Sequence, residues 1–381
     1  MGIRKFRPDR LFDGKQFAPP GAVLVCDETG RVLDILTEEA AGAGAADVEV
    51  LPGILLPGLI NCHCHLELSH LKGRVPESTG MVPFLLAVMQ RRFDAPDLIY
   101  EAMQAADQAM YESGIVAVGD ICNTTNSVAV KKQSRMNYVN FIEVSGFVPS
   151  GAHNRYEQAQ SVLKAFDSFT NASIVPHAPY SVSRELFSLL PAAAVSTMHN
   201  QESLEENEFF LAGSGPFNDL YKAIGVDIGF FSPPHTTSLQ AVLPYLPKAG
   251  NMILVHNTET STNDIFAWQQ LSALPTPWFC LCVRANQYIN SSLPPVDLLQ
   301  NSGHGLVLGT DSLASNHSLD LMAEVFTLLN HFPELPLERV LHWATLAGAE
   351  ALGLDQYLGS FVKGKKPGLV LLQGQRSKRI L

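Results

Sequence analysis

The sequence predicts an α/β fold, a (β/α)8 TIM-like barrel of eight parallel strands with a small β-sandwich subdomain built from both termini. Two patterns support this prediction. Strand-like apolar runs alternate with helix-like stretches through the middle of the chain, and strand-like runs without intervening helices occur at both ends. The length of 381 residues suits one large barrel and a smaller appendage.

Eight apolar runs of strand length occupy the middle of the chain, and most are followed by a helix-like stretch. They are Ile54–Cys64, Ile115–Ile121, Tyr138–Val144, Ala172–His177, Ala194–His199, Met252–His256, Trp278–Val283 and Gly305–Gly309. The clearest helical stretches are Ala102–Glu112 and Leu319–Leu329. This alternation is typical of a parallel barrel, whose functional residues gather at the carboxyl ends of the strands.

The two ends of the chain are predicted to share the small subdomain. Gly21–Cys26 and Arg31–Leu36 flank a turn and form a hairpin pattern, and Gly368–Leu372 is a short apolar strand near the C-terminus. We therefore assign residues 1–56 and 357–381 to the subdomain and residues 57–356 to the barrel.

The composition excludes several classes of partner. The net charge of −11 does not attract a phosphate backbone, so no nucleic acid is expected. No apolar run reaches the ~18 residues of a membrane helix, and the first residues lack the apolar segment of a signal peptide. The six cysteines include no CxxC pair, which favours buried, reduced thiols in a cytoplasmic protein over a thiolate zinc site.

The strongest chemical signal is the pair His63 and His65 at the end of the first barrel run. In a strand, residues two apart point to the same side, so both imidazoles can converge on one cation. The alternative is two polar residues that simply end a strand.

Other histidines and an aspartate also end predicted strands. They are His177, His199, His256 and Asp311. Because the carboxyl ends of the strands meet at one mouth of a barrel, these side chains are expected to converge. Taken alone, each histidine is equally well explained as structural, and Asp311 as the N-cap of the next helix.

Glu202 follows His199 by three residues. A carboxylate that stands beside a metal ligand without being one can move protons. The alternative is that Glu202 belongs to a solvated acidic cluster with Glu205, Glu206 and Glu208.

The order of these motifs is HxH, HAPYS, HxxE, a strand-end histidine and GTDS. It resembles the amidohydrolase superfamily, and more narrowly the branch that contains cytosine, guanine and adenosine-type deaminases and chlorohydrolases. The resemblance extends from about Leu55 to Ser315 and includes the flanking β segments. It implies one divalent metal ion, zinc or alternatively iron, held by His63, His65, His199 and Asp311.

The resemblance also implies roles for individual residues. His256 would hydrogen-bond the metal-bound water, and Asp311 would take up the proton of that water. Glu202 would carry a proton to the ring nitrogen and then to the leaving group. His177 and Ser315 would contact the substrate. The predicted fourth strand has no lysine of the kind that bridges two metals in binuclear members, which favours a single metal.

The segment His65–Ser69 resembles the HxHxEhS pattern of aminodeoxyfutalosine deaminases, which act on an adenine-bearing nucleoside in menaquinone biosynthesis. This implies that Glu67 binds hydroxyls or a ring N–H of the substrate, with an ion pair to Arg74 as the alternative. The segment Cys282–Asn286 resembles a strand-seven motif of the same branch, and Asn286 is interpreted as structural.

We therefore expect a metal-dependent aminohydrolase that removes an exocyclic amino group from a purine-like nucleoside or heterocycle. One alternative is a hydrolase of a cyclic amide or a halogenated ring. Another is a catalytically silent barrel that binds a ligand. The expected partner is a small-molecule substrate. A homodimer is compatible with the sequence.

Overall fold

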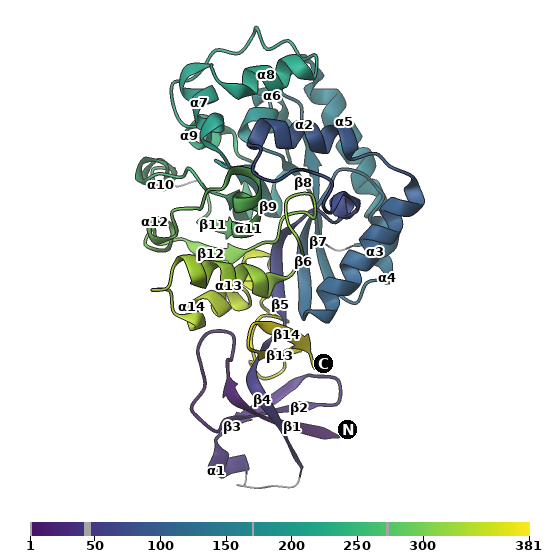
Figure 1. The fold of residues 1–381 in the computed structure, drawn as a ribbon, viewed down its shortest axis with the longest axis vertical. Coiled ribbons are helices and arrows are strands. Elements are labelled where there is room, and N and C mark those ends of the chain that lie inside the picture. The colour runs from purple at the N-terminus through teal and green to yellow at the C-terminus, as the bar shows by residue number, and fades with distance from the viewer. Residues whose placement is uncertain (1, 42–46, 170, 272–273) are drawn as a thin grey trace.

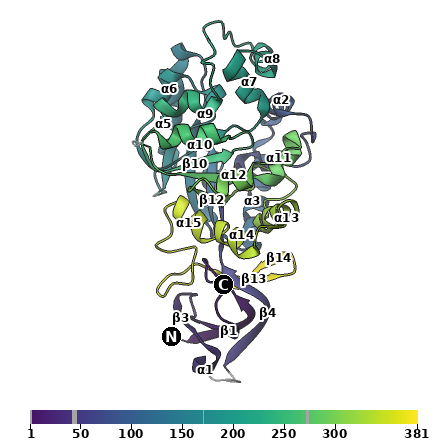
Figure 2. The ribbon, with the colours of Figure 1, turned by 90° about the vertical axis from the view of Figure 1, so that its left-hand side faces the viewer.

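The structure is a computed structural model that describes residues 2–41, 47–169, 171–271 and 274–381. A barrel surrounded by helices forms one body, and a small sheet forms a second body at one end of it (Figure 1). The view turned by 90° shows the same order along the long axis (Figure 2). Both chain ends lie at the small sheet, as the sequence predicts.

Eight parallel strands form the barrel and confirm the predicted fold class. They are β5 (Leu59–Cys64), β6 (Ile115–Cys122), β7 (Asn137–Val144), β8 (Ala172–Pro176), β9 (Ala193–Asn200), β10 (Ala249–His256), β11 (Pro277–Leu281) and β12 (Gly305–Leu308). They pair in chain order as two four-stranded ladders, β5 to β8 and β9 to β12. Backbone hydrogen bonds at the strand ends join the ladders. The N–H of His199 donates to the His177 carbonyl (2.9 Å), and those of Thr310 (3.0 Å) and Asp311 (3.1 Å) both donate to the His63 carbonyl.

The prediction of one continuous strand over Ile54–Cys64 is wrong, because two strands occupy that run. β4 (Val48–Pro57) belongs to the small sheet, and the barrel strand β5 begins at Leu59. Gly58 separates them at a point of close contact. A Cβ atom on Gly58 would lie 2.2 Å from Cγ1 of Val116 and 2.6 Å from the carbonyl oxygen of Pro367. Only glycine lets the chain pass here from one body to the other.

Helices cover the outside of the barrel. They are α2 (Met81–Arg91), α3 (Pro96–Glu112), α4 (Val128–Gln133), α5 (Ala152–Ala165), α6 (Arg184–Leu189), α7 (Leu204–Ala212), α8 (Pro216–Ala223), α9 (Ser238–Val242), α10 (Thr262–Gln269), α11 (Val283–Asn290), α12 (Val296–Gln300), α13 (Leu321–His331) and α14 (Leu337–Trp343). The last helix, α15 (Leu346–Ala351), packs instead against the inward-facing side chains of the barrel strands. The two predicted helices are confirmed as α3 and α13. Within the described ranges, no helix combines the length and hydrophobicity needed to cross a membrane.

The small body is one six-stranded sheet, where the sequence analysis expected a sandwich. Its strands are β1 (Ile3–Leu11), β2 (Val23–Asp27), β3 (Val32–Leu36), β4, β13 (Leu369–Gln373) and β14 (Arg376–Arg379), in the order β14-β13-β4-β1-β2-β3. The predicted hairpin is the antiparallel pair β2 and β3. The C-terminal strand β13 pairs with β4, so both ends of the chain complete one sheet. The short helix α1 (Glu38–Ala41) follows β3.

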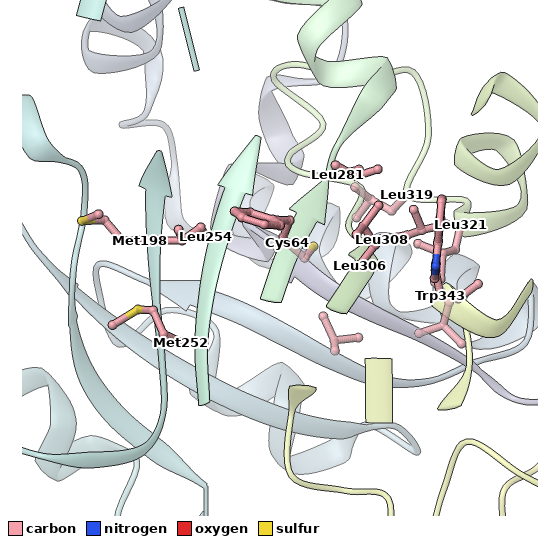
Figure 3. Close-up of a cluster of buried hydrophobic side chains, with 14 of the residues drawn as sticks. Cys64, Met198, Met252, Leu254, Leu281, Leu306, Leu308, Leu319, Leu321 and Trp343 are labelled. Carbon is pink, nitrogen blue, oxygen red and sulfur yellow. The ribbon is translucent and has the colours of Figure 1, made fainter. Parts of the chain in front are cut away.

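Both faces of the barrel strands are buried. In β10, Met252 and Leu254 pack outward against the helix layer, whereas Ile253 and Val255 pack inside the barrel. Figure 3 shows part of the outer layer, in which Leu254 and Leu281 lie with side chains from the C-terminal helical region. This double packing fixes the strand ends at the barrel mouth.

Candidate active site

Four buried side chains from three strand ends face one another at the mouth of the barrel. Nε2 of His65 lies 3.1 Å from Nε2 of His63 and 3.2 Å from Nε2 of His199. Oδ1 of Asp311 lies 3.5 Å from Nε2 of His63 and 3.4 Å from Nε2 of His65. These are the four residues that the sequence analysis expects to bind the metal.

The two histidines of the HxH motif converge through an irregular strand end. β5 breaks its register with β6 between Asn61 and Cys64. As a result Cys62 packs inside the barrel and Cys64 packs in the outer layer, although the two are separated by a single residue. Cys62 and Cys64 therefore do not share one face, as residues two apart in a regular strand would. The convergence of His63 and His65 comes from a bulge.

A buried ion pair holds the turn after His65. The backbone N–H of Leu66 donates to Oδ1 of Asp120 (2.8 Å), and Nζ of Lys131 lies 2.6 Å from Oδ2 of the same carboxylate. The side chains of Asp120 and Lys131 are both 0% exposed, so each charge depends on the other. The sequence analysis did not find this pair, because β6 and α4 supply one residue each.

Hydrogen bonds orient the other two predicted ligands, His199 and Asp311. Nδ1 of His199 donates to the carbonyl oxygen of His177 (2.9 Å), which leaves a lone pair on Nε2. Asp311 adopts a left-handed backbone (φ 56°) and accepts a hydrogen bond from Ser315 Oγ. It is no N-cap, because Asp320 caps α13 by accepting from the backbone N–H of Met322 (2.9 Å).

The electrostatics of this cluster suit a cation. Burial lowers the pKa of His65 to about 4 and the pKa of His199 well below its usual value. Burial alone would raise the pKa of Asp311, but a hydrogen bond from His63 and the nearby histidines outweigh it and hold that pKa low. Neutral imidazoles and an ionised carboxylate are a donor set for a divalent metal ion. Groups able to hold a metal include His63, His65 and Asp311.

Glu202 and His256 lie beside this cluster. Nε2 of His256 is 3.4 Å from Oε1 of Glu202, and burial, followed by the Asp311 and Glu206 charges, raises the pKa of Glu202 well above its usual value. Glu202 is 3% exposed, so it does not belong to a solvated acidic cluster. Glu206 is also buried, and its carboxylate accepts the backbone N–H groups of Gln201 and Glu202, each at 3.2 Å.

A cavity of about 570 Å³ opens onto the cluster, within the usual size range for small-molecule sites. The predicted residues that line it are His65, His177, His199, Glu202, His256 and Asp311. Apolar side chains from α2 and α8, including Phe84 and Leu220, line its outer part. These two helices lie at the end of the barrel away from the small sheet (Figures 1 and 2).

Glu67 and Ser315 lie outside that lining. The Glu67 carboxylate accepts the backbone N–H groups of Asn123 (3.1 Å) and Thr124 (3.0 Å) on one oxygen and Ser127 Oγ (3.1 Å) on the other. The alternative ion pair with Arg74 is not formed, since Arg74 pairs with Asp94. Glu67 thus anchors the loop that follows β6.

Glu143 is a site residue that the sequence analysis missed. It lies one residue before the end of β7 and lines the cavity. Its Oε2 accepts from Nδ2 of Asn123 (2.9 Å), and its Oε1 lies 3.4 Å from Nδ1 of His199. The available signal was a charged residue near the end of an otherwise uncharged barrel strand.

A (β/α)8 barrel with this buried cluster of histidines and a carboxylate at its mouth defines a metal-dependent hydrolase. The chain belongs to the amidohydrolase family, whose sequence pattern matches residues 54–380. This membership confirms the resemblance seen in the motifs.

Individual relatives are more distant. An adenosine deaminase of Helicobacter pylori is 29% identical over 315 residues, which cover 79% of this chain and 75% of the relative. A 5-methylthioadenosine/S-adenosylhomocysteine deaminase of Teredinibacter turnerae is 26% identical over 84% of this chain and 72% of the relative. The crystal structure of Helicobacter pylori aminofutalosine deaminase with methylthio-coformycin superposes with a TM-score of 0.77 at 21% identity, covering 96% of this chain and 91% of that chain. That likeness shows a shared fold.

Proposed function

We propose that the protein is a zinc-dependent aminohydrolase that removes the exocyclic amino group of an adenosine-type nucleoside. The observation that carries the proposal is Glu202, a buried carboxyl group with a raised pKa that faces both the metal-ligand cluster and the cavity. The relatives named as adenosine and 5-methylthioadenosine/S-adenosylhomocysteine deaminases support the choice of substrate class.

The residues that would hold the metal are His63, His65, His199 and Asp311. Three imidazole nitrogens and one carboxylate oxygen favour zinc. When bound, zinc would lower the pKa of water to about 7, so that hydroxide is available at neutral pH.

Glu202 and Asp311 supply the proton transfers. Because its pKa is raised, Glu202 carries a proton that it can give to the ring nitrogen as water adds to the neighbouring ring carbon. Asp311 accepts the proton that this water loses. Glu202, now ionised, takes the remaining proton of the added hydroxyl and passes it to the amino group, which leaves as ammonia while the ring carbon keeps the oxygen as a carbonyl. The proton held by Asp311 then returns to Glu202.

The same cluster would serve hydrolysis of a cyclic amide or a halogenated ring. A halide leaves a ring carbon without a proton, whereas an amino group needs one. The buried acid therefore favours the amine. A silent binding barrel would have no use for a carboxyl group held protonated beside the ligands.

The six cysteines are free and buried, which supports the expectation of a reducing, cytoplasmic compartment.

The test is ammonia release from a panel of amines by the zinc-loaded protein, with the metal-stripped protein as control. The panel holds adenosine, 5′-methylthioadenosine, S-adenosylhomocysteine, aminodeoxyfutalosine, guanine and cytosine. We expect turnover of one or more of the four nucleosides. Turnover of free bases alone would contradict the nucleoside assignment, and opening of a cyclic amide without any ammonia would contradict the aminohydrolase.

A further inference from the structure

Glu143 has a buried carboxylate oxygen with no hydrogen-bond donor. Its side chain is 6% exposed, and Oε1 has no hydrogen-bond partner among the residues that the structure describes. Nδ1 of His199 lies 3.4 Å from this oxygen, but its N–H donates instead to the carbonyl oxygen of His177. A buried carboxylate oxygen is costly to leave unpaired. A bound molecule can supply the missing donor.

The position of Glu143 supports this source. It lines the same cavity as His177 and Glu202, so a molecule bound in that cavity can contact both Glu143 and Glu202. The Glu143 carboxylate is separate from the four predicted metal ligands and comes from a different strand, β7.

The orientation of Glu143 is fixed by a chain of hydrogen bonds. Nδ2 of Asn123 donates to Oε2 of Glu143 (2.9 Å), and the backbone N–H of Asn123 donates to the buried Glu67 carboxylate (3.1 Å). Glu67 also fixes the same loop through Thr124 and Ser127. One oxygen of Glu143 is thus held by the protein while the other stays free, an arrangement that suits recognition.

We propose that Glu143 is a specificity-determining residue that accepts a hydrogen bond from a ribose hydroxyl of the substrate. This inference rests on the proposed function. In adenosine the ring nitrogens N1, N3 and N7 only accept hydrogen bonds, and the only N–H donor is the amino group that reacts beside Glu202. The ribose hydroxyls are therefore the donors left for Glu143.

The experiment compares kcat/KM for adenosine and 2′,3′-dideoxyadenosine in the zinc-loaded wild type and in Glu143→Ala. The variant should lose about 10- to 150-fold on adenosine, the range for one hydrogen bond to a charged group, and little on the dideoxy analogue. Glu143→Gln removes the charge and keeps the shape, so its selectivity should lie between those of the other two proteins. Glu185→Gln, an exposed carboxylate on α6, is the matched control and should behave as wild type.

Four outcomes would overturn the inference. Equal loss on both substrates in Glu143→Ala and Glu143→Gln would make Glu143 structural. Two zinc ions per wild-type chain and one in Glu143→Ala would make it a metal ligand with His177 and His199, with which it can form a metal-binding group. If the wild type releases ammonia from none of the four nucleosides of the panel, the proposed function fails and this inference fails with it. Release with unchanged selectivity in the variants overturns this inference alone.

Discussion

Nδ1 of His256 donates a hydrogen bond to Oδ1 of Asn286 over 2.8 Å. Asn286 is held in turn, because its Nδ2 donates to Oγ1 of Thr258 (3.0 Å). Burial lowers the pKa of His256 to about 4, so the ring is neutral and its Nε2 faces Glu202 as an acceptor. The sequence motif suggested only a structural role for Asn286, whereas the structure shows that it orients a site histidine.

Replacing Asn286 should therefore impair catalysis through His256. We expect Asn286→Ala to lower kcat by about 10- to 100-fold, as loss of an orienting partner typically does, with a smaller effect on KM. Asn286→Asp keeps an acceptor for Nδ1 and should retain more activity, with a shifted pH profile because the new charge favours imidazolium. Steady-state kinetics over a pH series measure both effects. Asn301→Ala, at an exposed asparagine, is the control, and similar kcat values for both alanine variants would argue against the orienting role.

Glu202→Gln should separate proton transfer from metal binding. The amide has nearly the same shape but carries no acidic proton. We expect kcat to fall by about 10²–10⁴-fold while the zinc content stays unchanged. Kinetics combined with metal analysis of the purified variant test this. A variant that turns over normally would remove Glu202 from the mechanism, and a variant that has lost its metal would make Glu202 a ligand.

Most of the sequence-based prediction of the fold and the site rested on where the predicted strands end. A buried parallel strand is a continuous apolar run, so the first polar residues after it mark the barrel mouth, and His63, His199 and Asp311 stand there. The strand count and the pairing of both chain ends followed from the same patterns. The boundary between two strands at Gly58 was not predicted, because an apolar run that continues from the small sheet into the barrel resembles a single strand.

The remaining parts of the site depend on contacts between distant segments. The side chain of Glu143 is held by Asn123 at the end of another strand, β6. The side chain of Asp120 is held by Lys131 in helix α4. His256 and Asp311 adopt left-handed backbones, with φ of 75° and 56°. Neither residue type requires this conformation, so the surrounding fold imposes it, and local sequence does not reveal it.

Glu67→Ala should act at a distance, because the Glu67 carboxylate holds the Asn123 loop that positions Glu143. We expect KM for nucleosides to rise while the metal remains bound, and free bases to be affected less because they offer no ribose. The measurement is kcat/KM for a nucleoside and its free base in both proteins. An equal change for the two ligands would indicate a general loss of loop structure instead.

Glu324 should make stability depend on pH. Burial raises its pKa to about 8, against the opposing hydrogen bonds from the backbone N–H of Arg284 and from Asn316. The folded state therefore binds this proton more tightly than the unfolded chain. The contribution of Glu324 to the free energy of unfolding is complete below pH 4.5, the ordinary pKa of a glutamate, and is lost as the pH rises through about 8. The slope is up to about 1.4 kcal/mol per pH unit. Thermal unfolding from pH 5 to 8 should show a falling Tm in the wild type and a flatter profile in Glu324→Gln. Parallel profiles would contradict the assigned pKa.

A zinc titration of deamination tests the central claim most directly. Metal-stripped protein receives increasing zinc, and ammonia release from an adenosine-type nucleoside that the wild type accepts is recorded together with the bound metal. We predict that activity rises in proportion to zinc and saturates at one ion per chain, because the fourth barrel strand has no lysine that would bridge a second metal. Full activity without metal, or no ammonia from any nucleoside at full zinc occupancy, would contradict the account.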